Sequence, residues 1–276
     1  MNLTIRFWGV RGSIATPGPR TVRTGGNTPC VEISCEDTLL ILDAGTGIRD
    51  LGERLMREDR RDATLLLSHL HWDHIQGLPF FVPAYVPGRS LTIRGARGLQ
   101  DALSAQMTAP SFPVTLDAFG ADVAFRAVVS GERFDVGPFS IQAAGLNHPG
   151  GVLGYRVTLG DRSIVYATDT EHYACPDPRL IDLARDADVL IYDAMYTDAE
   201  YPTKVGWGHS TWTAGVDVAD AAGVDRLVLF HHDPTRDDDA VDAIERAAAA
   251  TRGGTVAARE GESLVLAATP GARRAA

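Results

Sequence analysis

The sequence predicts an α/β fold made of layered strands and helices. Apolar runs typical of buried strands alternate along the chain with stretches typical of helices. The chain has 276 residues, of which 45% are hydrophobic, and this is enough to build one large core. We therefore expect residues 1–268 to form a single domain, followed by a disordered tail at residues 269–276.

The expected strands are short apolar runs bounded by glycine, proline or polar residues. They lie at residues 3–9, 30–34, 39–42, 63–67, 91–94, 163–170, 188–194, 226–230 and 263–267, and three more lie between residues 122 and 146, separated by turns at 130–131 and 137–138. The strands at 30–34 and 39–42 are joined by a short turn, which suggests a meander.

The expected helices lie at residues 48–57, 98–107, 213–222 and 238–250, and Ser210 or Thr211 is a natural cap for the third. Glycines and prolines exclude regular structure from the loops between these elements. The glycine-rich residues 24–29 could cradle phosphate, but a turn is the better interpretation. Residues 108–114 contain two prolines and either wall a substrate pocket or form an ordinary packed connection.

The composition argues against several classes of protein. The formal net charge is −10, and no run of basic residues is longer than Arg273-Arg274, so a general electrostatic grip on nucleic acid is not indicated. The N-terminus lacks the features of a signal peptide and no apolar run could span a bilayer, so we expect a cytoplasmic protein. The dispersed Cys30, Cys35 and Cys175 favour buried free thiols over a zinc ribbon.

One short stretch concentrates metal-binding residue types. Directly after an expected buried strand, residues 69–74 are His-Leu-His-Trp-Asp-His, which places three imidazoles and a carboxylate in six consecutive positions. In extended backbone, His69 and His71 point to the same side and can share one metal ion. Asp73 and His74 would then begin a helix and suit a second, adjacent ion. Histidines at this density beside a core strand are rarely unligated, so a metal site is preferred over a polar surface loop.

This stretch resembles the His-x-His-x-Asp-His signature of the metallo-β-lactamase superfamily. The resemblance implies a four-layer αββα sandwich and a hydrolase that holds two metal ions. It also implies a role for Asp43, which matches an aspartate at a strand end that supports the metal site by hydrogen bonding. The alternative for Asp43 is the N-cap of the helix expected at residues 48–57.

Three later positions match the remaining ligands of the superfamily: His148 ahead of a Gly-Tyr pair, Asp169 at a strand end, and His231 in a Leu-x-His-x-x-Pro segment. The resemblance implies one ion on His69, His71 and His148 and another on Asp73, His74 and His231, with Asp169 as the bridge. His232 is expected to support the site without binding metal.

The implied cofactors are two divalent metal ions. Imidazoles with few carboxylates and no thiolate suit zinc, and manganese and iron are alternatives. Two ions about 3.5–4 Å apart would hold a hydroxide between them as the nucleophile and would neutralise charge on the attacked centre. The sequence therefore predicts a hydrolase.

A loop motif, Gly-His-Ser-Thr at residues 208–211, together with Asp193, resembles the branch that contains the tRNA 3′-processing endonuclease and the phosphoribosyl cyclic phosphodiesterase. In that branch the loop histidine supports catalysis and pairs with a carboxylate, although the endonuclease usually carries Glu at the position of Asp193. We expect His209 to be a general acid or an electrostatic stabiliser held by Asp193, with Asp73 as a further catalytic residue. The alternative is a structural histidine that caps the loop.

From these features we expect a binuclear phosphodiesterase that acts on a small or cyclic phosphodiester, such as a cyclic nucleotide or cyclic sugar phosphate. The expected partners are that substrate alone, with no stable nucleic-acid complex and no membrane, and a homodimer is left open. A tRNA 3′-processing endonuclease is the first alternative, which the lack of a basic protruding arm disfavours. A lactone or thioester hydrolase is the second, and it would not need the His209 loop. The candidate phosphate contacts are Arg11, Ser13, Lys204 and Ser210.

Overall fold

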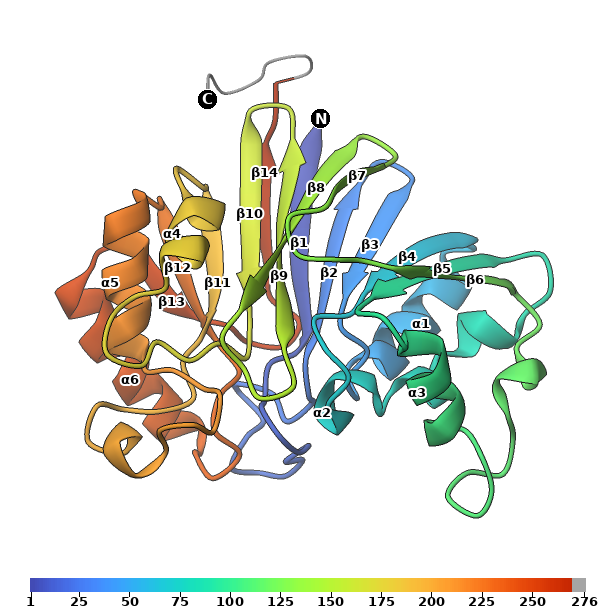
Figure 1. The fold of residues 1–276 in the computed structure, drawn as a ribbon, viewed down its shortest axis with the longest axis horizontal. Coiled ribbons are helices and arrows are strands. Elements are labelled where there is room, and N and C mark those ends of the chain that lie inside the picture. Colours follow the sequence, from blue (N-terminus) through green and yellow to red (C-terminus); the bar gives the residue numbers. More distant parts are fainter. Residues whose placement is uncertain (270–276) are drawn as a thin grey trace.

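The structure is a computed structural model that describes residues 1–269. The predicted disordered tail lies outside these residues except for Thr269. Within the described range the chain forms two seven-stranded sheets (Figure 1). The predicted division into one domain and a tail remains a prediction.

The first sheet has the strand order β14-β1-β2-β3-β4-β5-β6. Its strands are β1 (Asn2–Gly9), β2 (Cys30–Cys35), β3 (Thr38–Leu42), β4 (Asp62–Leu66), β5 (Ser90–Gly95), β6 (Asp122–Ala127) and β14 (Ser263–Ala267). The strands β1, β2 and β3 pair antiparallel, which confirms the predicted meander. From β3 to β6 the pairing is parallel.

The second sheet has the order β13-β12-β11-β10-β9-β8-β7. Its strands are β7 (Arg133–Val136), β8 (Phe139–Leu146), β9 (Val152–Leu159), β10 (Arg162–Ala167), β11 (Val189–Asp193), β12 (Arg226–Phe230) and β13 (Thr255–Ala257). From β10 to β13 the strands run parallel. All five residues of β11 are buried, as expected for a parallel strand that is covered on both faces.

The helices are α1 (Ile48–Arg57), α2 (Trp72–Ile75), α3 (Leu99–Gln106), α4 (Pro178–Ala184), α5 (Trp212–Ala222) and α6 (Asp238–Thr251). Short 3₁₀ turns lie at Leu78–Phe80, Val82–Tyr85, Leu116–Ala118 and Tyr201–Thr203. Thr211 caps α5 by accepting a hydrogen bond from the Ala214 N–H, as predicted. No helix in the described part of the chain is long and apolar enough to cross a membrane.

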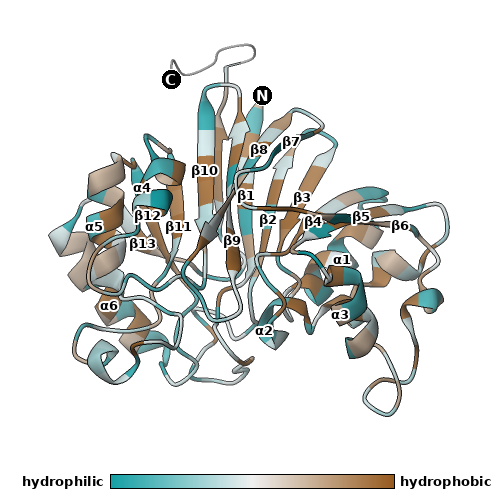
Figure 2. Cartoon of the chain, in the orientation of Figure 1, coloured by the Kyte–Doolittle hydropathy of each residue, from teal (hydrophilic) through white to brown (hydrophobic). Residues whose placement is uncertain are grey.

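Three apolar clusters hold the layers together. The cluster between the sheets contains inward-facing residues of both, such as Ile5 and Phe230. A second cluster, which includes Leu183 and Val216, joins the second sheet to α4, α5 and α6, and a third, which includes Leu51, joins the first sheet to α1 and α3. Figures 1 and 2 show these helices on opposite sides of the paired sheets, whose strands carry much of the hydrophobic sequence. The predicted αββα sandwich is therefore confirmed.

The parallel strands position the polar site. The chain leaves β3 at Asp43, β10 towards Asp169 and β12 at His231, so these residues lie at the carboxyl ends of strands from both sheets. All three residues have left-handed backbone, with φ of 61°, 50° and 58°. A non-glycine residue seldom adopts this conformation, and its recurrence at one edge of the fold is typical of a functional site.

Sequence reasoning missed three elements: α4, β9 and β13. Helix α4 is short, but Asp177 caps it and Pro178 opens it, a combination that favours a helix start. The strand β9 follows a loop with two consecutive glycines and contains Gly154, which obscured its pattern.

Cys30 and Cys35 are buried free thiols as predicted, whereas Cys175 is exposed in the loop before α4. In the segment 108–114 only Phe112 is half-buried, and it packs edge-on against the exposed Phe80, so the role of this segment stays a prediction.

Candidate metal centre

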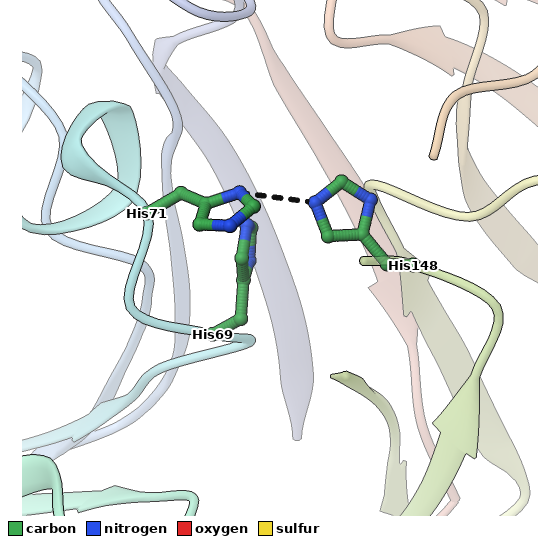
Figure 3. Close-up of side chains that lie close together, drawn as sticks. All are labelled: His69, His71 and His148. Atoms are coloured by element: carbon green, nitrogen blue, oxygen red, sulfur yellow. Dashed lines mark hydrogen bonds between the residues drawn. The ribbon is translucent and has the colours of Figure 1, made fainter. Parts of the chain in front are cut away.

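Three histidines from two parts of the chain converge beyond the strand ends. His69 and His71 lie in the loop between β4 and α2, and His148 follows β8 (Figure 3). Each offers a ring nitrogen, and these atoms lie within 4.8 Å of one another. His71 Nδ1 and His148 Nε2 are 3.0 Å apart. The predicted pairing of His69 and His71 on one side is therefore present, with ring centroids 4.4 Å apart.

A second group combines two imidazoles with two carboxylates, and all four residues are buried: Asp73, His74, Asp169 and His231. Asp73 Oδ2 lies 3.3 Å from His74 Nε2 and 3.2 Å from His231 Nε2. Asp169 Oδ1 lies 3.1 Å and 3.2 Å from the same two nitrogens. Tetrahedral ligands with bonds of about 2.0–2.2 Å are about 3.4 Å apart, so these spacings suit a shared cation.

Asp169 stands between the two groups. Its Oδ1 faces His74 and His231, while its Oδ2 lies 3.7 Å from His69 Nε2 and 3.8 Å from His148 Nε2. One carboxylate thus presents one oxygen to each group. This is the arrangement that a bridging ligand between two ions requires.

The outer nitrogens of three histidines are fixed by the protein. His74 Nδ1 lies 2.7 Å from Asp43 Oδ2, His148 Nδ1 lies 2.8 Å from the Gly208 carbonyl oxygen, and His69 Nδ1 lies 3.1 Å from Ser68 Oγ. When Nδ1–H donates to these partners, the Nε2 lone pair faces the centre of the site. Such outer partners fix both the tautomer and the orientation of a metal-binding imidazole.

The centre has the electrostatics of a cation site. Burial and nearby imidazoles hold the pKa of His69 well below its usual value, so its ring is neutral and can bind metal. Burial opposes a charge on His74, but Asp169 and Asp73 outweigh it and raise the pKa of His74 well above its usual value. The buried His69 Nε2, His74 Nε2 and His231 Nδ1 have no hydrogen-bond partner among the described residues. Divalent cations would engage the two orphaned Nε2 atoms and balance the carboxylates, so the residues fit metal ions.

Asp43 forms the hub beneath this site. It is fully buried and accepts hydrogen bonds from the Ser68 N–H at 2.7 Å and from the Tyr166 hydroxyl at 2.8 Å, in addition to the His74 ring. The helix-capping alternative is wrong, because the N-cap of α1 is Gly47 and no side chain caps that end. Asp43 orients His74 instead.

We expect Asp43→Asn to lower metal affinity by roughly 10–100-fold, because the amide has only one oxygen to accept these hydrogen bonds. Competition with a chromogenic chelator measures the affinity, and circular dichroism checks the fold. Asp188→Asn is a matched control, since Asp188 is also a buried carboxylate but precedes β11, at the end of that strand away from the site. Unchanged affinity in a folded Asp43→Asn protein would contradict this role.

His209 and Asp193 form the predicted pair. His209 Nδ1 lies 2.8 Å from Asp193 Oδ2, so the shorter aspartate reaches the ring. The His209 ring stacks on that of His231, with centroids 5.0 Å apart. Burial opposes the charged ring, but Asp193 outweighs it and raises the pKa of His209 to about 9. Ligand atoms of His209, Asp193, Asp169 and His231 also lie within 4.8 Å of one another, so geometry alone leaves His209 able to approach a metal.

The choice between His231 and His232 is clear from their partners. His231 faces Asp73 and Asp169, whereas His232 donates to the Ala258 carbonyl oxygen at 3.0 Å. Burial and the nearby Arg11 lower the pKa of His232 to about 3, so it remains neutral. The expected support of the metal site by His232 is therefore corrected: this side chain ties its loop to the segment after β13.

Two expected phosphate contacts are wrong because the side chains are buried and already bonded. Arg11 is fully buried and donates to the carbonyl oxygens of Gly25 and Arg236, at 2.7 and 2.9 Å. Ser210 Oγ is also buried and lies 2.7 Å from both His172 Nδ1 and the Tyr192 hydroxyl. Both residues stabilise loops beside the site.

The other two expected phosphate contacts lie nearer the surface. The Ser13 N–H donates to Asp73 Oδ2 at 2.8 Å, so this backbone group orients Asp73 and is not free for phosphate. The Lys204 ammonium lies 4.0 Å from the centre of the Trp207 ring. Lys204 therefore remains a candidate for contact with an anionic substrate.

Sequence reasoning missed Glu171, a fully buried carboxylate two residues after Asp169. It accepts hydrogen bonds from the N–H groups of Gly206 and Gly208, at 2.7 and 2.8 Å, and from the Tyr201 hydroxyl at 2.8 Å. Glu171 thus holds the loop whose Gly208 carbonyl orients His148. An isolated acidic residue carries no such signal in a sequence, because its partners lie about 30 or more positions away.

Comparison with known proteins agrees with this geometry. A family model described as "Beta-lactamase superfamily domain" matches residues 38–232, a range that contains Asp43 and every expected metal ligand. A ribonuclease Z from Haloarcula marismortui is 25% identical over 95% of this chain and 96% of its own length.

Solved structures show the same fold at low sequence identity. The metallo-β-lactamase fold protein YhfI from Bacillus subtilis has a TM-score of 0.73 and 20% identity, and the match covers 96% of this chain and 99% of that one. The short form of human tRNase Z has a TM-score of 0.67 and 22% identity, with coverage of 96% and 99%.

These relatives correct the expectation of a small substrate without nucleic acid. Several proteins named ribonuclease Z match most of the chain, and a ribonuclease acts on RNA. The expectation rested on the lack of a basic protruding arm and on the net charge of −10, which is a sum over the whole molecule. Nucleic acid requires favourable contacts only around the bond that is cut, so a global charge cannot exclude it.

Proposed function

Because the chain belongs to the β-lactamase superfamily and is a metal-dependent hydrolase of that fold, we propose that it is a ribonuclease Z-type endonuclease acting at the 3′ end of tRNA precursors. The observation that carries the proposal is similarity over nearly the full length to proteins of that name. The His209–Asp193 pair supports it, since this pair marks the phosphodiester-cleaving branch that the sequence resembles.

The proposed centre holds two divalent ions, with zinc as the ion that best suits the donors. His69, His71 and His148 would hold one, and Asp73, His74 and His231 the other, with Asp169 between them. When bound, such ions supply Lewis acidity towards phosphoryl oxygens and an activated water nucleophile.

The protein residues around the centre position and move protons. Asp43 and the Gly208 carbonyl keep the Nε2 lone pairs of His74 and His148 directed inward. The His209 Nδ1–H donates a hydrogen bond to Asp193, so Nε2 is the atom of this ring that can protonate a leaving oxygen. The leaving group in RNA cleavage is a sugar alkoxide, which needs such a proton.

The test is cleavage of a tRNA precursor that carries a 3′ trailer, compared with cyclic nucleotides, a lactone and a thioester. We expect one cut at the acceptor end, its loss with a chelator, and its recovery with zinc or manganese. His69→Ala serves as the negative control for a contaminating nuclease. An inert precursor, with rapid turnover of a cyclic diester, lactone or thioester, would overturn the proposal.

A further inference from the structure

Two tryptophans beside the metal centre are unusually exposed. Trp72 is 75% exposed and Trp207 is 59% exposed. Large rings on a surface usually belong to a binding site when they lie together around a functional centre. Neither ring has a place in the metal chemistry, so their exposure needs a separate explanation.

The two tryptophans come from opposite halves of the fold, and each is the sequence neighbour of a residue at the histidine group. Trp72 follows His71, and Trp207 precedes Gly208. His71 Nδ1 lies 3.0 Å from His148 Nε2, and His148 Nδ1 lies 2.8 Å from the Gly208 carbonyl oxygen. This chain of contacts, part of which is seen in Figure 3, places the backbone of the two tryptophans on either side of the histidine group.

Both rings are mounted on rigid backbone. The buried carboxylate of Glu171 accepts the N–H groups of Gly206 and Gly208, which flank Trp207 on both sides. Trp72 opens α2, and its carbonyl accepts the Gln76 N–H at 2.7 Å. A side chain carried on fixed backbone loses less conformational freedom on binding than one on a mobile loop.

The surroundings of Trp207 indicate what kind of ligand fits. The Lys204 ammonium lies 4.0 Å from the ring centre, and the backbone N–H of Trp207 donates to the Lys204 carbonyl oxygen at 3.0 Å. An ammonium group above an aromatic ring keeps its own N–H donors available for a phosphate. Flat aromatic faces beside a cation are the means by which proteins bind single-stranded nucleic acid.

We propose that Trp72 and Trp207 are stacking platforms for nucleobases near the scissile phosphate, and that Lys204 neutralises a neighbouring phosphate. This inference rests on the proposed function, which places an RNA phosphodiester over the metal centre between the two rings. Stacking gives a chain of net charge −10 a grip on RNA that does not depend on overall basicity. It also offers a substitute for the basic arm that the sequence lacks.

The test measures binding of a short RNA whose scissile linkage is an uncleavable methylene phosphonate, by fluorescence anisotropy with the metal-loaded protein. We expect Trp72→Ala and Trp207→Ala each to weaken binding about 5- to 150-fold. Trp→Phe at the same positions should recover much of the loss, because phenylalanine also stacks. Val265→Ala is the control, an exposed apolar side chain on β14 that is 58% exposed.

A second comparison uses RNAs in which single bases near the scissile linkage are replaced by abasic sites. If a tryptophan ring stacks on a base, an abasic RNA bound to the Trp→Ala variant should lose little more affinity than either change causes alone. If the losses of affinity from the Trp substitutions and from the abasic sites add fully at every RNA position, in a protein that cleaves RNA, the stacking inference is overturned and the proposed function is left intact. Failure of the wild-type protein to bind or cleave RNA would overturn both the stacking inference and the proposed function. Conversion of a dimer to a monomer by the Trp substitutions, with RNA affinity unchanged, would assign the rings to a second copy of the chain and also overturn the inference.

Discussion

Asp169→Ala is expected to abolish hydrolysis and to release metal from both positions. Each oxygen of this carboxylate faces a different group of histidines, so no other described residue serves both groups in the same way. Loss of bound cations removes several kcal/mol of charge stabilisation in the transition state, so the rate should fall by at least about 10³-fold. Metal analysis of the purified proteins should give close to two equivalents for wild type and well below one for the variant.

The control for Asp169→Ala has to separate metal loss from unfolding. Asp188→Ala removes another buried carboxylate, one that binds Arg162 and the Ser163 N–H and lies at the amino end of β11, away from the carboxyl ends that carry the site. It should lower the temperature of unfolding while both metals and the hydrolytic rate are retained. A folded Asp169→Ala protein that kept two equivalents of metal would show that this carboxylate is not a bridge.

The candidate metal-binding residues could be chosen from sequence because some are local and the others match motifs of the superfamily. Four of these residues lie in six consecutive positions, and Asp43, Asp169 and His231 each follow a recognisable apolar strand. Carboxyl ends of parallel strands meet at one edge of a sheet, so a strand prediction already brings such residues together. The structure brings these side chains together, and their binding of metal stays a prediction.

The substrate contacts could not be predicted in this way, because they depend on tertiary burial. Arg11 and Ser210 have the right chemistry for phosphate, but each is enclosed by loops that come from distant parts of the sequence. Glu171 was missed for the same reason, since its importance comes from Gly206 and Gly208 folding back onto it. Trp72 and Trp207 gave no sign of being exposed, because tryptophan side chains are highly buried on average.

His209→Ala is expected to slow RNA cleavage by roughly 10²–10⁴-fold while both metals are retained. The RNA leaving group is a poor one and needs a proton, which His209 Nε2 can supply because Asp193 holds Nδ1. A nitrophenyl diester leaves without protonation, so its hydrolysis should be affected much less. His172→Ala is the matched control: His172 bonds the neighbouring Ser210 and tests whether disturbance of the loop alone produces the difference.

The pH dependence distinguishes a general acid from a metal ligand. Asp193 outweighs burial and raises the pKa of His209 to about 9, so the ring carries its proton at neutral pH and loses it as pH rises. Bound cations would lower this value, so the wild-type rate on RNA should decline on the alkaline side at or below pH 9. That decline should disappear in His209→Ala and move to lower pH in Asp193→Asn, where the charge that raises the pKa is gone. If His209 binds metal instead, as its place beside Asp169 and His231 would permit, the alanine variant should lose metal and slow equally on both substrates.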